Sequence, residues 1–390
     1  MKVINGKHNF AKIYIDDVED AVIEQTTNML SSPVFKDTRV RIMPDTHAGK
    51  GSVVGFTSTL GKAIIPNVVG VDGSCGIYSW NLGKKSIDLP DLDKFIHKNI
   101  PHGFGQNESK NYAVYEISKS STPEILDLFE LTSKKIGLDN DKVLKSIGSL
   151  GGGNHFISIE QDEQGNNWLL VHSGSRNFGL KIANYYQDMA KSFCSKSLIE
   201  VEKDLEYLPM EYGGKEYLSE TDVANKFAHW NRYIIGKRII NFLKRDIDNC
   251  ESIFSIHNYI NLEDNIIRKG ATQAKKGQSL LIPLNMKDGT LICIGKGNYE
   301  WNFSAPHGAG RLYSRTKAKE TLSMSDFTKS MEGIYSSCIM ESTLDESPMS
   351  YKDMNDIIDN IQDTVEIKHH LKTIYNFKDT SESKKYGKNK

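Results

Sequence analysis

The sequence predicts an α+β protein in which one large domain has a β-rich core and a helical excursion at about residues 180–250. Two observations support this fold class. Short apolar runs with a strand-like pattern recur along the chain, and helical stretches alternate with them. No linker rich in Pro, Ser or Gly divides the chain, so we expect a single domain over residues 1–378.

The expected elements follow from apolar periodicity and from the turn residues that bound each run. Strands are expected at residues 38–44, 51–59, 76–82, 154–160, 167–173, 252–258, 279–285 and 290–297. Helices are expected at residues 17–31, 122–136, 219–245 and 352–375. Residues 379–390, "DTSESKKYGKNK", are polar and poor in aliphatic side chains, which predicts a disordered tail.

Composition narrows the class of protein. The chain has 390 residues, of which 38% are hydrophobic and 25% charged, as in soluble globular proteins. Its net charge of −1 gives no global attraction for nucleic acid, so such a partner would require a local basic patch. No segment resembles a signal peptide or approaches the ~20 apolar residues of a membrane span, and we expect a cytoplasmic protein without a membrane partner. Five cysteines without a CxxC pair argue against a disulfide framework.

Several predicted strands end in residues suited to catalysis or metal binding. In "MPDTHAGKG" (43–51), Asp45 and His47 are two positions apart and share one face of an extended segment. In "VVGVDGSCGIYSW" (68–80), Asp72 and Cys75 flank a glycine turn, where oxygen and sulfur ligands suit a borderline metal such as Zn²⁺ or Mn²⁺. The alternatives are a polar turn in the first case and a buried cysteine beside a turn in the second.

Three histidines follow the same pattern. His155 comes after three glycines and Asn154, His172 ends an apolar strand before "SGSR", and His257 lies in "FSIHNYI". Each histidine alone is compatible with a structural role. Together with Asp72 and Cys75 they suffice for two adjacent metal sites, an arrangement that suits phosphoryl transfer.

The segment "SAPHGAGR" (304–311) places His307 between a proline and a glycine, ahead of the basic run "RLYSRTKAK". Glycines beside a histidine allow a bulky anionic group to approach it closely. The basic run can supply positive charge to phosphates, or it can be the solvated face of a helix.

The ordered set of motifs resembles the RtcB RNA ligases, known from tRNA splicing and RNA repair. The resemblance runs from about residue 39 to residue 378. It rests on "MPDTHAGKG", "VGVDGSCG", "GGGNHF", "HSGSR", "HNY", "RKGAT", "SAPHGAGR" with "SRTKAK", and "DESPMSYK", all in the family's order.

The resemblance implies a ligase that uses GTP and two Mn²⁺ ions to join RNA ends bearing a 3′-phosphate or 2′,3′-cyclic phosphate to 5′-hydroxyl ends. His307 would carry GMP, Asp45 and His47 would lie near the substrate ends, and an archease-like protein is a possible activator. The implied metal ligands are Asp72, Cys75, His155, His172 and His257, with Cys75 bridging the ions. The implied nucleotide-binding residues are Asn154, Ser158, Asn285, His307, Gly308, Gly310, Arg311, Tyr351 and Lys378. Arg176, Arg315 and Lys317 are implied to bind RNA or phosphate.

Two positions depart from the family pattern in the nucleotide pocket. Ser158 stands where the family has a glutamate that reads guanine, and Asn285 replaces a serine that contacts the base. We therefore expect relaxed or altered nucleotide choice. Two other functions remain open: a metal-dependent phosphodiesterase or 3′-end capping enzyme that does not seal RNA, and an RNA-end binder without turnover.

Overall fold

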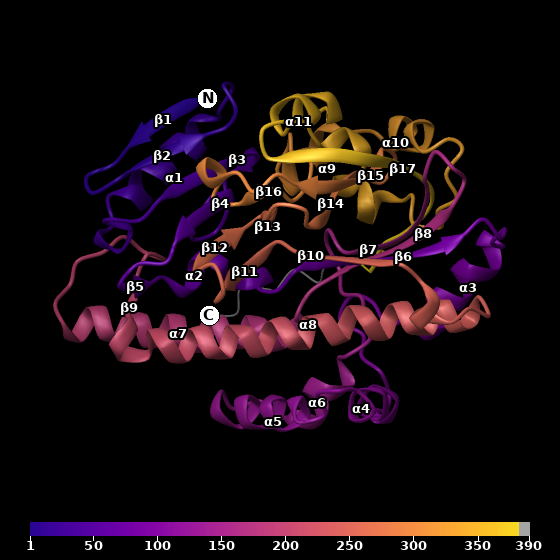
Figure 1. The fold of residues 1–390 in the computed structure, drawn as a ribbon, viewed down its shortest axis with the longest axis horizontal. Coiled ribbons are helices and arrows are strands. Elements are labelled where there is room, and N and C mark those ends of the chain that lie inside the picture. The colour runs from indigo at the N-terminus through magenta and orange to yellow at the C-terminus, as the bar shows by residue number, and fades with distance from the viewer. Residues whose placement is uncertain (382–390) are drawn as a thin grey trace.

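Two β-sheets form the core of the protein, and the computed structural model describes residues 1–381 (Figure 1). The first sheet has the strand order β1 (Lys2–Asn5), β2 (Phe10–Ile13), β3 (Val40–His47), β4 (Val54–Thr59), β12 (Ile266–Lys269) and β11 (Asn258–Asn261). The second has the order β10 (Ser252–Ile256), β6 (Gly76–Gly83), β8 (Asn167–Ser173), β7 (Phe156–Gln161), β17 (Val365–Phe377), β15 (Gly289–Gly295) and β14 (Ser279–Asn285). Two short pairs complete the β structure: β13 (Ala271–Gln273) with β16 (Ser304–Pro306), and β5 (Ala63–Ile64) with β9 (Leu208–Pro209).

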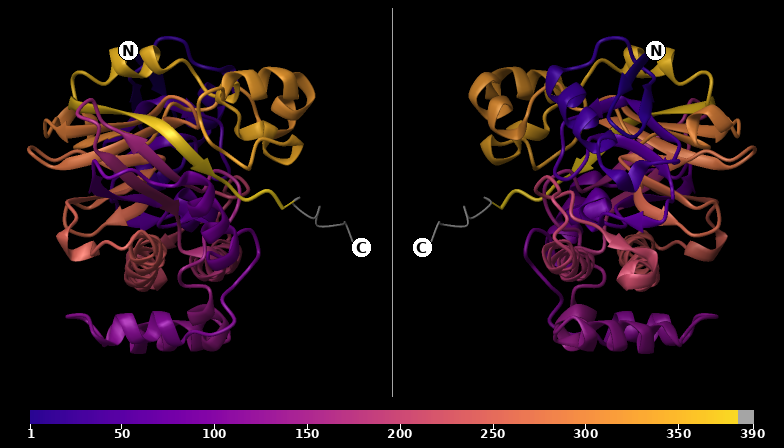
Figure 2. Two further views of the ribbon diagram at one scale, coloured as in Figure 1. Left: turned by 90° about the vertical axis from the view of Figure 1, so that its right-hand side faces the viewer. Right: turned by 90° about the vertical axis from the view of Figure 1, so that its left-hand side faces the viewer.

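Two long helices, α7 (Arg176–Lys196) and α8 (Lys215–Phe242), lie side by side along one face of the sheets (Figures 1 and 2). They make up most of the predicted helical excursion. The remaining helices are α1 (Asp20–Leu30), α2 (Pro66–Val69), α3 (Leu89–Asn99), α4 (Asn111–Ser118), α5 (Ile125–Lys135), α6 (Asn140–Lys145), α9 (Arg315–Thr321), α10 (Met324–Ser330) and α11 (Met354–Asn360). Helices α4, α5 and α6 lie on the side of α8 that faces away from the sheets (Figure 2).

Helix α8 is apolar on two sides because it is packed between two clusters of side chains. On one side Phe227 contacts Phe129 of α5 and Phe178 of α7. On the other side, Ile235 and neighbouring apolar residues join the core that covers β6 and β8. A helix buried on two sides cannot show a narrow apolar stripe, yet its length and helix-forming composition still predict it from sequence.

Gly236 of α8 lies against the side chain of Trp80 on β6. A methyl group added at Gly236 would overlap the indole ring of the fully buried Trp80. We expect Gly236→Ala to destabilise the fold by about 1–3 kcal/mol, since overpacking outweighs the gain in helix propensity. Thermal unfolding measures this effect, and an unchanged or raised melting temperature would contradict the packing described.

The predicted strands are present, with ends that differ by a few residues, and three of the four predicted helices are present as α1, α5 and α8. The fourth helix prediction, residues 352–375, is wrong for most of its length. Only α11 is helical there, and residues 365–377 form β17, which joins β7 to β15. His369 and His370 therefore lie on a strand. The segment "VEIKHHLKTIYNF" carries polar side chains on its exposed positions. Its apolar residues recur with a helix-like spacing, and this spacing concealed the strand in the sequence.

The described chain ends at residue 381, so most of the predicted disordered tail, residues 382–390, lies outside the described residues. Within residues 1–381, no helix has both the length and the apolar character needed to cross a membrane. All five cysteines are free thiols.

Candidate active site

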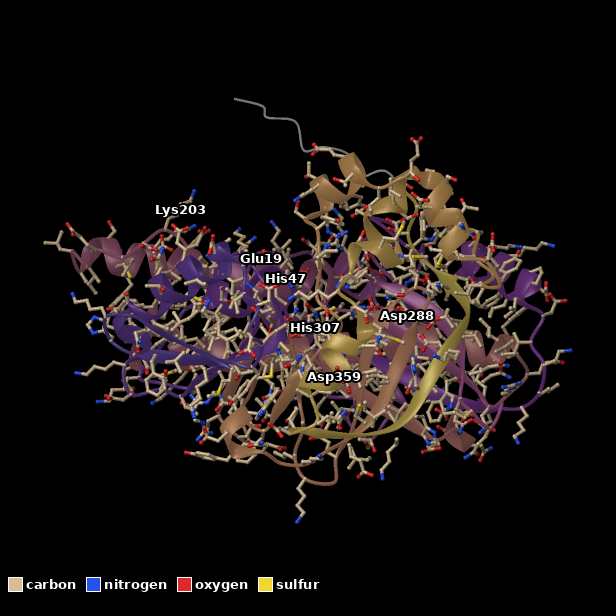
Figure 3. All side chains as sticks on the ribbon, turned by 90° about the horizontal axis from the view of Figure 1, so that it is seen from above. Glu19, His47, Lys203, Asp288, His307 and Asp359 are labelled. Atoms are coloured by element: carbon tan, nitrogen blue, oxygen red, sulfur yellow. The ribbon has the colours of Figure 1, made fainter. Side chains whose placement is uncertain are left out.

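A cavity of about 900 Å³ opens where the loops of the two sheets meet. Figure 3 shows His47 and His307 next to each other near the centre of the molecule, with Glu19 close by. Most of the residues singled out from sequence line this cavity. They are His47, Asp72, Asn154, His172, His257, Asn285, His307, Gly308, Gly310, Arg311, Arg315, Lys317, Tyr351 and Lys378.

His307 follows β16 directly, and a carboxylate of β3 fixes its ring. The Nδ1 atom of His307 lies 2.7 Å from Oδ2 of Asp45, which also accepts a hydrogen bond from the His307 backbone at 3.1 Å. Asp45 is fully buried, whereas His307 remains 18% exposed. Because Nδ1 donates its proton to the carboxylate, the lone pair of Nε2 stays free, as a nucleophilic imidazole requires.

The backbone conformation and surroundings of residue 310 explain why one of the residues after His307 is glycine. Its φ angle is +76°, and a side chain there would meet the carbonyl oxygen of Asp45 at 2.5 Å. The glycine thus allows the His307 loop to pack against the backbone of β3. Contact with the backbone of Asp45 is sufficient to require glycine at position 310.

A thiol and three imidazoles converge beside His307, whose ring centroid lies 4.8 Å from that of His257. Sγ of Cys75 lies 3.1 Å from Nε2 of His172 and 3.4 Å from Nε2 of His155. Nε2 of His172 lies 3.2 Å from Nε2 of His257. Within residues 1–381, the ligand atoms of Cys75, His172 and His257 all lie within 4.8 Å of one another. This geometry brings together a side chain of β8 and side chains of the residues just before β6, β7 and β11.

The chemistry of this cluster fits a metal ion. Burial raises the pKa of the Cys75 thiol and holds the pKa values of His172 and His257 well below their usual range. Burial likewise lowers the pKa of His155 to about 3, and its Nδ1 atom lies 2.9 Å from the Leu150 carbonyl, so that Nε2 faces Cys75. Neutral imidazoles beside a thiol suit a borderline divalent ion, which would displace the thiol proton on binding.

Asp72 lines the same cavity but lies outside the group of three whose ligand atoms are closest together. It is placed by a tight turn in which the Cys75 backbone N–H donates to the Asp72 carbonyl at 3.1 Å. Asn258, the residue after His257, also donates to that carbonyl, at 3.2 Å. The side-chain amide of Asn258 thus ties the two predicted ligand segments together, and the backbone N–H of His257 adds a second link by donating to the Cys75 carbonyl at 3.0 Å.

The cationic side of the cavity is organised by one buried glutamate. Glu346 is 3% exposed and forms ion pairs with Arg311 at 3.2 Å, with Arg315 at 2.6 Å and with Lys378 at 3.0 Å. The hydroxyl of Tyr351 donates to the same carboxylate at 2.7 Å. All four partners were predicted from sequence to bind nucleotide or phosphate, and Glu346 holds them in one cluster.

The comparisons with known proteins agree with these motifs. A family model described as tRNA-splicing ligase RtcB matches residues 25–379. The chain belongs to the RtcB family. It is 33% identical to the RNA-splicing ligase RtcB of Escherichia coli K12, over 92% of this chain and 94% of that protein. It is 26% identical to the tRNA-splicing ligase RtcB of Aeropyrum pernix, over 88% and 89% of the two chains, and 25% identical to that of Thermococcus kodakarensis, over 89% of each.

Three other residues that the RtcB resemblance implied to bind nucleotide, RNA or phosphate form hydrogen bonds within the protein. Arg176 donates to the Gly103 carbonyl at 2.6 Å and to the Ser149 hydroxyl at 3.1 Å. The Asn285 side chain accepts two backbone N–H groups in the β14–β15 turn, both at 2.9 Å. Ser158 is fully buried and donates to Glu160 at 2.8 Å.

Two acidic residues of this RtcB-family site were missed at the sequence level. Glu346 lies within the motif "DESPMSYK" but was not assigned a role, because its three cationic partners come from two distant segments. Glu160 lies on β7 two positions after Ser158 and lines the cavity. The alternation of a strand, which places residues 158 and 160 on one face, was the available signal.

Replacing Glu346 with glutamine is expected to destabilise the protein by about 3–5 kcal/mol, since it leaves the buried Lys378 and the largely buried Arg311 without this counter-ion. Although burial alone would raise it, the charges of Lys378, Arg315 and Arg311 hold the pKa of Glu346 well below 4.5. The stabilisation is therefore present above pH 4.5 and is lost as the pH falls towards the lowered pKa.

Thermal unfolding of Glu346→Gln at neutral pH, with Glu341→Gln as the control, measures this loss. Glu341 begins the short 3₁₀ helix Glu341–Glu346, which ends at Glu346, and Glu341 is exposed. Equal melting temperatures for the two variants would show that the cations do not depend on Glu346.

Proposed function

We propose that the protein is an RNA ligase that joins a 3′-phosphate or 2′,3′-cyclic phosphate end to a 5′-hydroxyl end through a guanylyl-histidine. The observation that carries this proposal is the 2.7 Å contact between His307 Nδ1 and Asp45, at the wall of a cavity that also contains a thiol–imidazole cluster and a cationic cluster. A nucleophile, a candidate metal centre and phosphate-binding side chains are the parts that nucleotidyl transfer requires.

In the first step Nε2 of His307 attacks the α-phosphorus of GTP, forming an N–P bond as the bond to pyrophosphate breaks. Asp45 keeps the proton on Nδ1 and offsets the positive charge that develops on the ring. Arg311, Arg315 and Lys378 are placed to bind the phosphates. Two Mn²⁺ ions bound by Asp72, Cys75, His155, His172 and His257 would polarise the phosphate oxygens.

In the second step an oxygen of the RNA 3′-phosphate attacks the guanylyl phosphorus and releases His307. The 5′-hydroxyl of the other RNA end then attacks the activated 3′-phosphate, and GMP leaves. A 2′,3′-cyclic phosphate is first opened by water to the 3′-phosphate. Lys317 is exposed at the rim of the cavity, where it can contact the RNA backbone.

The test uses two short RNAs, one ending in a 2′,3′-cyclic phosphate and the other beginning with a 5′-hydroxyl, with GTP and Mn²⁺. A joined product that requires GTP and is absent with His307→Ala is expected. Opening of the cyclic phosphate, or a guanylylated 3′ end, without a joined strand would instead support an end-processing enzyme. A parallel reaction with an archease-like protein measures whether an activator accelerates turnover.

A further inference from the structure

A second carboxylate lies in the wall of the cavity, and its environment is opposite to that of Glu346. Glu160 is 2% exposed and lines the cavity together with Thr290 and Asn376. Its Oε1 atom accepts hydrogen bonds from the hydroxyls of Ser158 at 2.8 Å and Thr290 at 3.3 Å. Hydroxyl groups, rather than cations, thus hold this carboxylate in place.

Two acceptor atoms at this part of the wall have no donor within residues 1–381. They are Oε2 of Glu160 and the side-chain oxygen of Asn376, both buried. Asn376 lies opposite Ser158 in the pairing of β17 with β7, and Glu160 is the next residue of β7 on the same face. A buried acceptor without a partner costs roughly 1–3 kcal/mol, so a ligand with two donors would bind favourably here.

The four nucleobases differ in the donors that their Watson–Crick edges present. Guanine presents two adjacent donors, N1–H and the 2-amino group. Adenine and cytosine each present one donor beside an acceptor, and uracil presents one donor between two acceptors. Guanine alone matches a pair of unpartnered acceptors.

We propose that Glu160, with Asn376, is the specificity-determining residue that selects guanine in the nucleotide cavity. The inference rests on the proposed nucleotidyl transfer to His307. It reverses the expectation of relaxed nucleotide choice drawn from Ser158, because the carboxylate is supplied two positions further along the same face of β7 and Ser158 orients it. Burial raises the pKa of Glu160 to about 7, and hydrogen bonds from guanine favour its ionised form.

Covalent labelling of the full chain with α-³²P-labelled GTP, ITP or ATP in the presence of Mn²⁺ tests this assignment. ITP differs from GTP only by lacking the 2-amino group. We expect GTP to label the wild type about 10- to 100-fold more efficiently than ITP or ATP, because each unpaired buried acceptor costs a factor of that order.

Glu160→Gln presents one donor and one acceptor in nearly the same volume. We expect it to lower the GTP-to-ATP ratio of labelling efficiencies at least about tenfold. Glu163→Gln is the matched control on the turn after β7, since Glu163 is exposed and contacts His369 and His370. This control should keep the wild-type ratio.

Equal labelling of the wild type by GTP and ITP would overturn the assignment without reference to any variant. A wild-type GTP-to-ATP ratio in Glu160→Gln would overturn it as well, while leaving the proposed function intact. Absence of label from all three nucleotides on the wild type would reject the proposed function and this inference with it.

Discussion

Replacing Asp45 with asparagine is expected to slow nucleotide transfer to His307 by about 100- to 10,000-fold, the range that positioned proton-handling groups contribute. Asparagine has the same shape but no charge. It cannot stabilise the imidazolium that forms as Nε2 attacks. Asp45 also accepts the His307 backbone N–H at 3.1 Å. The amide oxygen of asparagine can accept this hydrogen bond as well, so the loop itself should stay in place.

The rate of label incorporation from α-³²P-GTP measures this effect. Asp359→Asn is the control, since Asp359 is exposed on α11 and is not among the described residues that line the cavity. Labelling of Asp45→Asn at close to the wild-type rate would mean that the 2.7 Å contact does not prepare His307 for attack.

Replacing Cys75 with alanine is expected to weaken Mn²⁺ binding by at least about 100-fold, since loss of even an outer-shell partner of a metal ligand costs roughly 10- to 100-fold. Sγ of Cys75 lies within 3.4 Å of Nε2 of both His155 and His172, so its loss removes the ligand that these imidazoles share. Equilibrium dialysis with metal analysis measures the affinity and the number of ions bound.

Cys250→Ala is the matched control, because Cys250 lies outside the cavity and its thiol contacts the Asp246 carbonyl. Equal Mn²⁺ affinity in the two variants would contradict the assignment of the thiol–imidazole cluster as the metal centre. Loss of a single ion from Cys75→Ala would argue against a bridging role for Cys75.

The residue types of the site could be predicted from sequence because each lies at or near an end of a strand, within a short motif. Cys75, His172 and His257 come from three separate segments, yet each segment alone carries its own turn signal and apolar strand. The polarity of a strand end is a local property, and local patterns are what a sequence displays directly.

The contacts between motifs could not be predicted, because they depend on how distant segments pack. Asp45 and His307 are 262 positions apart, and only the approach of the β16 end to β3 makes them partners. The same holds for Glu346, whose cations lie on both sides of it in the chain. The wrong helix at residues 365–377 has a related cause, since β17 is a strand through its pairing with β7 and β15.

The measurement that tests the account most directly is covalent labelling of the metal-loaded protein with α-³²P-GTP, followed by denaturation. A nucleotidyl-histidine at His307 predicts label that is acid-labile and alkali-resistant in the wild type and absent from His307→Ala. Label that persists in His307→Ala, or no label on the wild type with any nucleotide, would contradict a nucleotidyl-histidine at His307.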